Sequence, residues 1–205
     1  ETELIPLPKF DVLMLVPFYE LSDACKAVNA IFKAGITPSG MEFMERDALV
    51  WASEHLGEEK FQIPDGIAAH LLIELDGNHL DLLYQEAEQI VQVLEGFNCD
   101  SPLFAEDSKQ KEQLWKLRRV VGEAVKAKSI YKEEDTVVPR FELPKLIIGV
   151  KEIGKRYGFK SVCYGHAGDG NLHINILKGE MSDESWENEL PKGITEIFAV
   201  SYTHL

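Results

Sequence analysis

The residues that most restrict the fold and chemistry of this chain are Cys163-Tyr164-Gly165-His166-Ala167-Gly168-Asp169-Gly170-Asn171-Leu172-His173-Ile174-Asn175. Strand-favouring residues flank a connection of glycine and asparagine, which tolerate the positive φ values of a tight reversal. The pattern predicts a β-hairpin with a histidine near the base of each arm. Residues opposite one another on paired strands have Cβ atoms about 4.5–5.5 Å apart. Two imidazoles at that separation can share one metal ion, provided that both face the same side.

The overall composition indicates a folded, acidic protein. The chain has 205 residues, of which 45% are hydrophobic and 27% are charged, and its formal net charge is −14. These values are typical of a globular chain with one large or two small domains. The negative charge argues against nucleic acid and anionic membranes as partners, because both require basic patches.

The sequence contains no recognisable targeting or membrane-spanning segment. It has no N-terminal signal pattern and no apolar run of about 18 residues. The three cysteines are widely spaced and include no CxxC motif, so no disulfide framework is indicated. We therefore expect a cytoplasmic protein in a reducing compartment.

Hydrophobic periodicity predicts alternating strands and helices along the rest of the chain. Strands are expected at 11–17, 41–44, 68–75 and, weakly, 99–105; helices are expected at 22–34, 47–55, 78–95, 107–127, 141–157 and 183–199. Residues 128–134 are polar and are expected to form a loop. Because the strands are few and short, we favour an α+β fold, an antiparallel sheet with helices packed on one face, over a parallel α/β sheet. The spacing suggests two ferredoxin-like βαβ halves.

Several stretches resemble the C-terminal domain of FAD-linked oxidases, the flavoenzymes that include the glycolate oxidase large subunit, D-lactate dehydrogenase and D-2-hydroxyglutarate dehydrogenase. The hairpin segment from Gly165 to Asn175 resembles the signature of that family, and its motif is specific. The other matching stretches follow in chain order: Glu3-Leu4-Ile5-Pro6-Leu7-Pro8, Ala34-Gly35-Ile36-Thr37-Pro38 with Met41-Glu42-Phe43-Met44, Leu71-Leu72-Ile73-Glu74-Leu75-Asp76-Gly77, Leu114-Trp115-Lys116-Leu117-Arg118, and Val137-Val138-Pro139-Arg140 with Leu143-Pro144. The resemblance covers about residues 1–199.

The resemblance implies that the chain is a fragment of an enzyme. Residues 1–10 would be a lead-in from the family's FAD-binding domain, residues 11–199 the C-terminal domain, and residues 200–205 a tail outside the family. The FAD-binding domain and the Gly-Glu-His-Gly motif that should follow the last helix are both absent. We expect a substrate or cap domain that is inactive alone. Its partners would be a small 2-hydroxy acid, the FAD-binding domain of the same polypeptide and further subunits, in a parent complex peripheral to the membrane.

The resemblance also implies a reaction and a set of site residues. The parent enzyme would transfer a hydride from Cα of glycolate or D-lactate to FAD, which is bound mainly by the missing N-terminal domain. His166 and His173 would bind a divalent metal, expected to be zinc, whose third ligand is the glutamate of the missing motif. His173 would also serve in catalysis, Arg118 and Asn175 would bind the substrate, and Asn171 would contact the flavin.

The residues alone leave simpler interpretations open. Two histidines make an incomplete metal site and also suit a hydrogen-bonded hairpin. Arg118 follows Trp115 by three residues on one helix face and, without the family, is more readily a surface arginine. Asn175 shares the strand face of His173, where it can simply fill an edge position. Asn171 is equally suited to a turn hydrogen bond.

Two other functions compete with the flavoenzyme interpretation. The first is a stand-alone metal-binding or interaction module without catalysis. The second is a hydrolytic metalloenzyme that uses His166, His173 and Asp169. The lack of a third metal ligand and of a general base argues against this second alternative.

Overall fold

The computed structural model describes residues 7–57 and 63–202. Most of the lead-in expected at residues 1–10, and residues 203–205 of the expected tail, lie outside this part of the chain. The strands are β1 (Phe10–Phe18), β2 (Gly40–Glu45), β3 (Ala69–Gly77), β4 (Leu103–Phe104), β5 (Tyr131–Val137), β6 (Lys160–Gly165) and β7 (Asn171–Leu177). The helices are α1 (Leu21–Lys33), α2 (Arg46–Leu56), α3 (Leu80–Leu94), α4 (Ser108–Lys126), α5 (Leu143–Tyr157), α6 (Asp183–Asn188) and α7 (Leu190–Tyr202).

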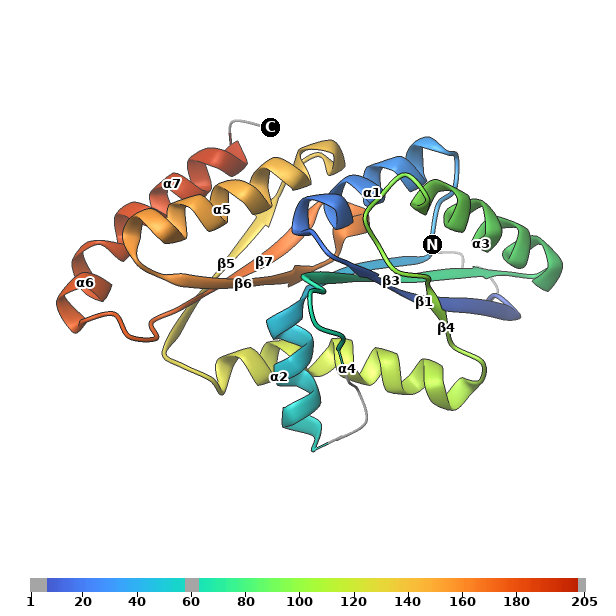
Figure 1. Cartoon of the computed structure of the whole chain (residues 1–205), viewed down its shortest axis with the longest axis horizontal. Coiled ribbons are helices and arrows are strands. Elements are labelled where there is room, and N and C mark those ends of the chain that lie inside the picture. Colours follow the sequence, from blue (N-terminus) through green and yellow to red (C-terminus); the bar gives the residue numbers. More distant parts are fainter. Residues whose placement is uncertain (1–6, 58–62, 203–205) are drawn as a thin grey trace, which may run out of the picture.

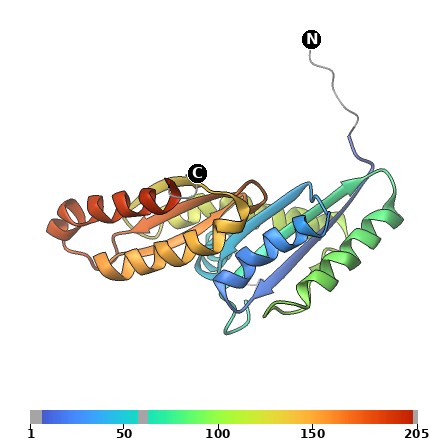
Figure 2. The same cartoon turned by 90° about the horizontal axis from the view of Figure 1, so that it is seen from above.

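All these strands form one antiparallel sheet in the order β4-β1-β3-β2-β6-β7-β5. The first four strands have the order 4-1-3-2 of a ferredoxin-like unit. In the second half, β5-β7-β6 repeats the arrangement of β1-β3-β2, and Figure 2 shows the two halves side by side. The halves meet where β2 pairs with β6, through Phe43 opposite Gly165 and Met44 opposite Tyr164. The predicted α+β class and antiparallel sheet are therefore confirmed.

Helices cover both faces of the sheet. Figure 1 shows α1, α3, α5 and α7 on one face and α2 with α4 on the other. The expectation of helices on a single face therefore holds for the first group but not for α2 and α4. The cause is visible in β1, where Val12 and Met14 pack into one hydrophobic cluster and Leu13 and Leu15 into the other. A strand buried on both faces has a continuous apolar run, whereas a strand with one solvated face alternates.

Three local predictions differ from the structure. Residues 131–137, expected mostly as a loop, form the edge strand β5, and most of their side chains are at least partly exposed. The helix expected at 183–199 is divided into α6 and α7, with Pro191 in the first turn of α7, where a missing backbone N–H is tolerated. The strand expected at 99–105 is reduced to two residues of β4 and an isolated bridge between Phe18 and Cys99.

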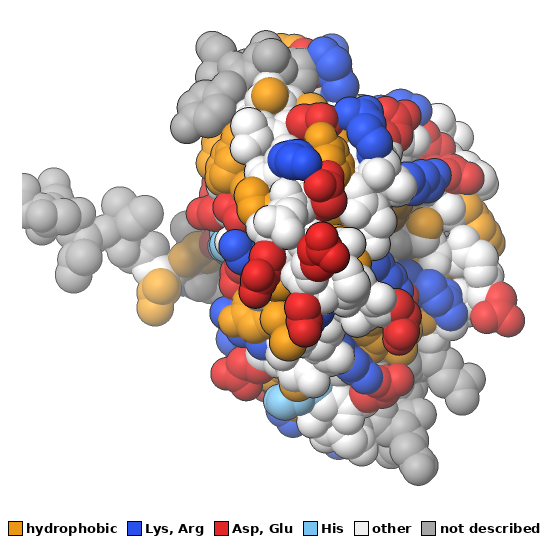
Figure 3. Space-filling model, turned by 90° about the vertical axis from the view of Figure 1, so that its left-hand side faces the viewer, with side chains coloured by type: hydrophobic (Ala, Val, Ile, Leu, Met, Phe, Trp, Pro, Cys, Tyr) orange, Lys and Arg blue, Asp and Glu red, His pale blue; other side chains and the backbone are white. Residues whose placement is uncertain are grey.

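The surface of the described chain carries mixed charge. On the face shown in Figure 3, basic and acidic side chains are interspersed, and the described residues form no continuous basic area there.

His70 on β3 makes folding stability dependent on pH. Its side chain is almost fully buried, and burial, with a smaller contribution from Arg46, lowers its pKa from 6.5 to about 4. The unfolded chain therefore takes up a proton near pH 6.5, whereas the folded chain does so only near pH 4, and stability is lost as the pH falls through this interval. We expect a loss of roughly 3 kcal/mol at the acid end, since one pKa unit corresponds to about 1.4 kcal/mol.

Urea denaturation at several pH values between 4 and 7 would measure this loss. His70→Gln should remove most of the pH dependence, whereas His55→Gln, at an exposed site, should leave it intact. An unchanged slope in His70→Gln would show that another group is responsible.

Candidate active site

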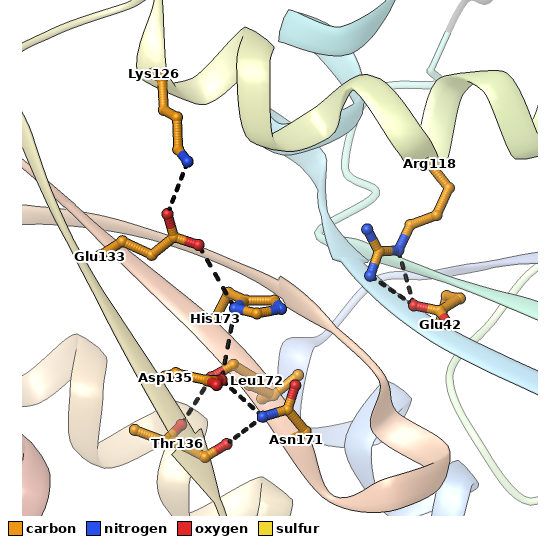
Figure 4. A network of polar contacts seen from close by, with 9 residues as sticks. All are labelled: Glu42, Arg118, Lys126, Glu133, Asp135, Thr136, Asn171, Leu172 and His173. Atoms are coloured by element: carbon orange, nitrogen blue, oxygen red, sulfur yellow. Dashed lines mark hydrogen bonds and ion pairs between the residues drawn. The ribbon is translucent and has the colours of Figure 1, made fainter.

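The centre of the candidate site is Glu42, a buried acid on β2. Arg118 donates from Nε to Glu42 Oε2 at 2.8 Å, and its Nη2 lies 2.7 Å from the same oxygen. The other carboxylate oxygen, Oε1, lies 2.7 Å from Nδ1 of His166. One carboxylate therefore links a cation from helix α4 to a histidine from the hairpin, and Figure 4 shows the Arg118–Glu42 contact.

Arg118 and Trp115 lie on the same face of helix α4, as the sequence predicted. Trp115, one turn earlier on α4, donates from Nε1 to Glu74 Oε1 on β3 at 3.0 Å. The same face of α4 therefore lies against the sheet, and only 11% of the Arg118 side chain is exposed. The interpretation of Arg118 as a surface arginine is wrong. Glu42, which the sequence singled out only as part of the stretch Met41-Glu42-Phe43-Met44, joins Arg118 and His166 in this candidate site.

The predicted β-hairpin is confirmed, but its two histidines are not opposite one another. His173 on β7 pairs with Tyr164 on β6, and His166 lies just beyond the end of β6, in the connection. The two imidazole rings still lie close together, with centroids 6.3 Å apart, and the Tyr164 and His173 rings are separated by 5.3 Å. The connection therefore brings His166 back toward His173.

Strand β5 supplies carboxylates to His173. Asp135 is opposite His173 in the β5–β7 register, and Nδ1 of His173 lies 3.5 Å from both Asp135 Oδ1 and Glu133 Oε1. Lys126 at the end of α4 lies 3.1 Å from the second oxygen of Glu133, as Figure 4 shows. The two 3.5 Å distances are long for hydrogen bonds, but they place both carboxylates close enough to attract a positively charged imidazole. The alternation of Glu133 and Asp135 was the available signal for this strand.

Two buried polar groups lie near His173. Asn175 is on the same strand face, as predicted, and is fully buried; its amide nitrogen and oxygen lack a hydrogen bond of normal geometry with described residues, and the Tyr164 hydroxyl is a neighbouring polar group. Such a group costs free energy unless a ligand or water satisfies it. Tyr164 is also buried, and burial together with the charge of Glu133 raises the pKa of its hydroxyl. The Arg118 guanidinium lies 5.3 Å from the centre of the Tyr164 ring.

The side chain of Asn171 links the hairpin to strand β5. Its Nδ2 donates to Asp135 Oδ1 at 2.7 Å and to the Thr136 carbonyl at 3.2 Å. Both amide hydrogens are therefore used in holding β7 to β5.

The histidine pair satisfies only part of the requirement for a metal site. A structural or catalytic zinc site needs at least three protein ligands. The described residues contain no group of three histidine, cysteine, aspartate or glutamate side chains placed to hold one ion. Each histidine does have a carboxylate near Nδ1, which is the usual outer partner of a ligand histidine. The described residues therefore do not by themselves complete a metal site around His166 and His173.

The described chain contains no helix that is both long and apolar enough to cross a membrane.

Comparison with curated proteins identifies relatives of one kind. The chain is 27% identical over 201 residues to D-lactate dehydrogenase of Anaerostipes hadrus, covering 96% of this chain and 42% of that protein. It is 28% identical over 197 residues to glycolate oxidase subunit GlcD of Bacillus subtilis (strain 168), covering 96% and 41%. A probable mitochondrial D-2-hydroxyglutarate dehydrogenase of Oryza sativa subsp. japonica is 33% identical over 152 residues, covering 71% and 26%. The chain thus spans less than half the length of these relatives.

Solved structures share the fold at low sequence identity. p-Cresol methylhydroxylase with bound substrate superposes with a TM-score of 0.67 at 12% identity, over 96% of this chain and 44% of that one. Alkyldihydroxyacetonephosphate synthase gives a TM-score of 0.61 at 10% identity, over 97% and 40%. Residues 7–200 match the sequence model of FAD linked oxidases, C-terminal domain. The chain therefore belongs to the FAD-linked oxidase family and corresponds to its C-terminal domain.

Proposed function

We propose that this chain is the substrate domain of a cytoplasmic, FAD-dependent oxidoreductase that oxidises a small 2-hydroxy acid, such as D-lactate or glycolate, to the 2-oxo acid. The observation that carries the proposal is the grouping of Arg118, His173 and the unsatisfied amide of Asn175 on one face of the sheet. A cation, a proton acceptor and a polar binding group are what a 2-hydroxy acid requires. The names of the relatives supply the substrate class.

Arg118 is the proposed carboxylate-binding group. Glu42 occupies its Nε and Nη2, so the planar guanidinium is held in one orientation and Nη1 is left for a substrate oxygen. A group that is already ordered loses little entropy on binding. Asn175 would complete the binding site by hydrogen bonding to the hydroxyl or carboxylate, which would satisfy its buried amide.

His173 is the proposed proton acceptor. As a hydride leaves Cα, the substrate hydroxyl must lose a proton, and an imidazole within reach is suited to receive it. Glu133 and Asp135 would stabilise the positive charge that His173 gains. FAD, when bound, supplies the hydride acceptor. Side-chain exposures of 26% for His173 and 54% for His166 leave both imidazoles accessible to groups from outside the chain.

His166 and His173 can supply two nitrogen ligands to a divalent metal. A third ligand would have to come from outside the described residues. No step of the proposed reaction depends on that ion.

Arg118→Lys tests the proposal in the FAD-containing protein that carries this domain. Lysine keeps the charge but loses the planar fork, so we expect the KM for D-lactate or glycolate to rise at least about tenfold, equivalent to about 1.4 kcal/mol. Steady-state kinetics with a dye acceptor would measure it. Arg119→Lys, at an exposed neighbour paired with Glu112, should leave KM unchanged. An unaltered KM in Arg118→Lys would remove Arg118 from the site.

A further inference from the structure

Arg140 differs from the other arginines of the described chain. Arg46, Arg118, Arg119 and Arg156 each lie within 4 Å of a carboxylate. Arg140 makes no ion pair with any described residue, although the protein carries a net charge of −14. In so acidic a protein, a guanidinium without an acid partner is available for an anionic ligand.

The side chain of Arg140 is held in place without being neutralised. Its Cζ lies 3.9 Å from the centre of the Phe32 ring on α1, a stacking distance. Its Nε donates to the carbonyl of Gly168 at 2.6 Å. These contacts occupy one face of the guanidinium and one of its nitrogens. The two terminal nitrogens form the fork that matches a carboxylate or phosphate. They make no hydrogen bond or ion pair with described residues.

The fixed guanidinium borders a polar cavity of about 280 Å³ that adjoins the candidate active site. The cavity is lined in part by Thr37, Ser39, Glu42, Arg140, His166 and Asp169. Glu42 and His166 belong to both the cavity and the site. A ligand that contacts His166 can therefore extend toward Arg140.

The acids in the cavity wall do not cancel the charge of Arg140. Glu42 is already compensated by Arg118 and faces His166. Asp169 is exposed, so water and salt screen its field. Arg140 therefore remains an uncompensated cation at the cavity wall.

We propose that Arg140 binds an oxyanion group of the ligand that enters this cavity, at a subsite separate from Arg118. The group is a carboxylate or a phosphate, since both match the guanidinium fork. It would be the second carboxylate of a dicarboxylic substrate or the phosphate of the flavin cofactor. Only the identity of the ligand rests on the function proposed above; the oxyanion subsite itself rests on Arg140, Phe32 and the cavity.

Nuclear magnetic resonance of the isotope-labelled 205-residue chain tests the subsite. Malonate and inorganic phosphate would be titrated at constant ionic strength while the Arg140 Nε–H signal and the Gly168 amide are followed. We expect saturable shifts at both positions. Arg140→Gln should weaken binding at least about tenfold, as expected for loss of a charge-assisted hydrogen-bond pair.

Arg156→Gln is the matched control, because Arg156 is also exposed but pairs with Glu196, and neither residue lines this cavity. It should bind both probes as the unmodified chain does. Equal weakening in the two variants, or the absence of a saturable shift at Arg140, would overturn the proposal.

Two further comparisons identify the source of the oxyanion. Arg140-dependent binding of FMN but not riboflavin would assign the subsite to a flavin phosphate. Arg140-dependent binding of malonate but not acetate would assign it to a second substrate carboxylate. Failure of the oxyanion subsite would be distinguishable from failure of the proposed function, because Arg118→Lys should raise the substrate KM whether or not Arg140 binds an anion.

Discussion

Glu42→Leu should destabilise the folded chain by about 3–5 kcal/mol, because it leaves the buried Arg118 guanidinium without a counter-charge. The side chains of Glu42 and Arg118 are 8% and 11% exposed, so water cannot replace the missing carboxylate fully. The His166 Nδ1 also loses its partner. Urea denaturation followed by circular dichroism would measure the change in the free energy of unfolding.

A double variant separates the buried charge from other effects of the substitution. Glu42→Leu combined with Arg118→Leu removes both charges and should recover most of the lost stability, since apolar replacements of a buried pair are often neutral. Glu112→Leu is a surface control that removes the exposed partner of Arg119 and should cost at most about 1 kcal/mol. If the double variant were as unstable as Glu42→Leu, the unpaired charge would not be the cause.

The same pair of variants distinguishes stability from recognition. The double variant should fold but should no longer bind a carboxylate through α4, since the guanidinium is gone. A protein that regained both stability and substrate binding would show that Arg118 serves only the fold.

The order of strands and helices could be predicted because it depends on local signals. In β1, α1 and β3, apolar periodicity and the turn residues that follow are contained within a few residues of sequence. Gly35 and Gly57 both adopt positive φ at or just after helix ends, where the sequence pattern predicts that the helices stop. Most of the edge strand β5 was not predicted because its residues are mainly polar. Their side chains face solvent or the candidate site, and only Thr136 is buried.

The candidate site could be predicted only in part, because its contacts join distant segments. Motif residues such as His166, His173 and Arg118 were found, whereas Glu42 was not. The bond from Arg118 to Glu42 spans 76 positions in the sequence, and no local pattern distinguishes a buried acid from a solvated one. Glu133 was missed for a related reason, since its proximity to His173 follows from the β5–β7 register.

Gly170→Ala should be similarly damaging, with a loss of about 4 kcal/mol. Gly170 ends the turn after His166 with φ +76°, a region that costs an alanine about 1–2 kcal/mol. An added Cβ would also lie 1.9 Å from the carbonyl oxygen of Val138. That carbonyl belongs to the backbone, so it cannot rotate away, and overpacking of this kind costs about 1–3 kcal/mol.

Gly158→Ala isolates the steric part of this effect. Gly158 follows α5 with φ +77°, almost the same as Gly170, but its added Cβ would meet no atom within 4 Å. We therefore expect Gly158→Ala to lose only the conformational part, about 1–2 kcal/mol. Equal losses would mean that the contact with Val138 is unimportant. A larger loss in Gly170→Ala, measured by thermal unfolding, would show that close backbone packing at Val138 holds the His166 connection against β5. Because the Val138 amide also donates to the Gly170 carbonyl at 3.0 Å, that packing helps to position His166 and Arg140 on the wall of the same cavity.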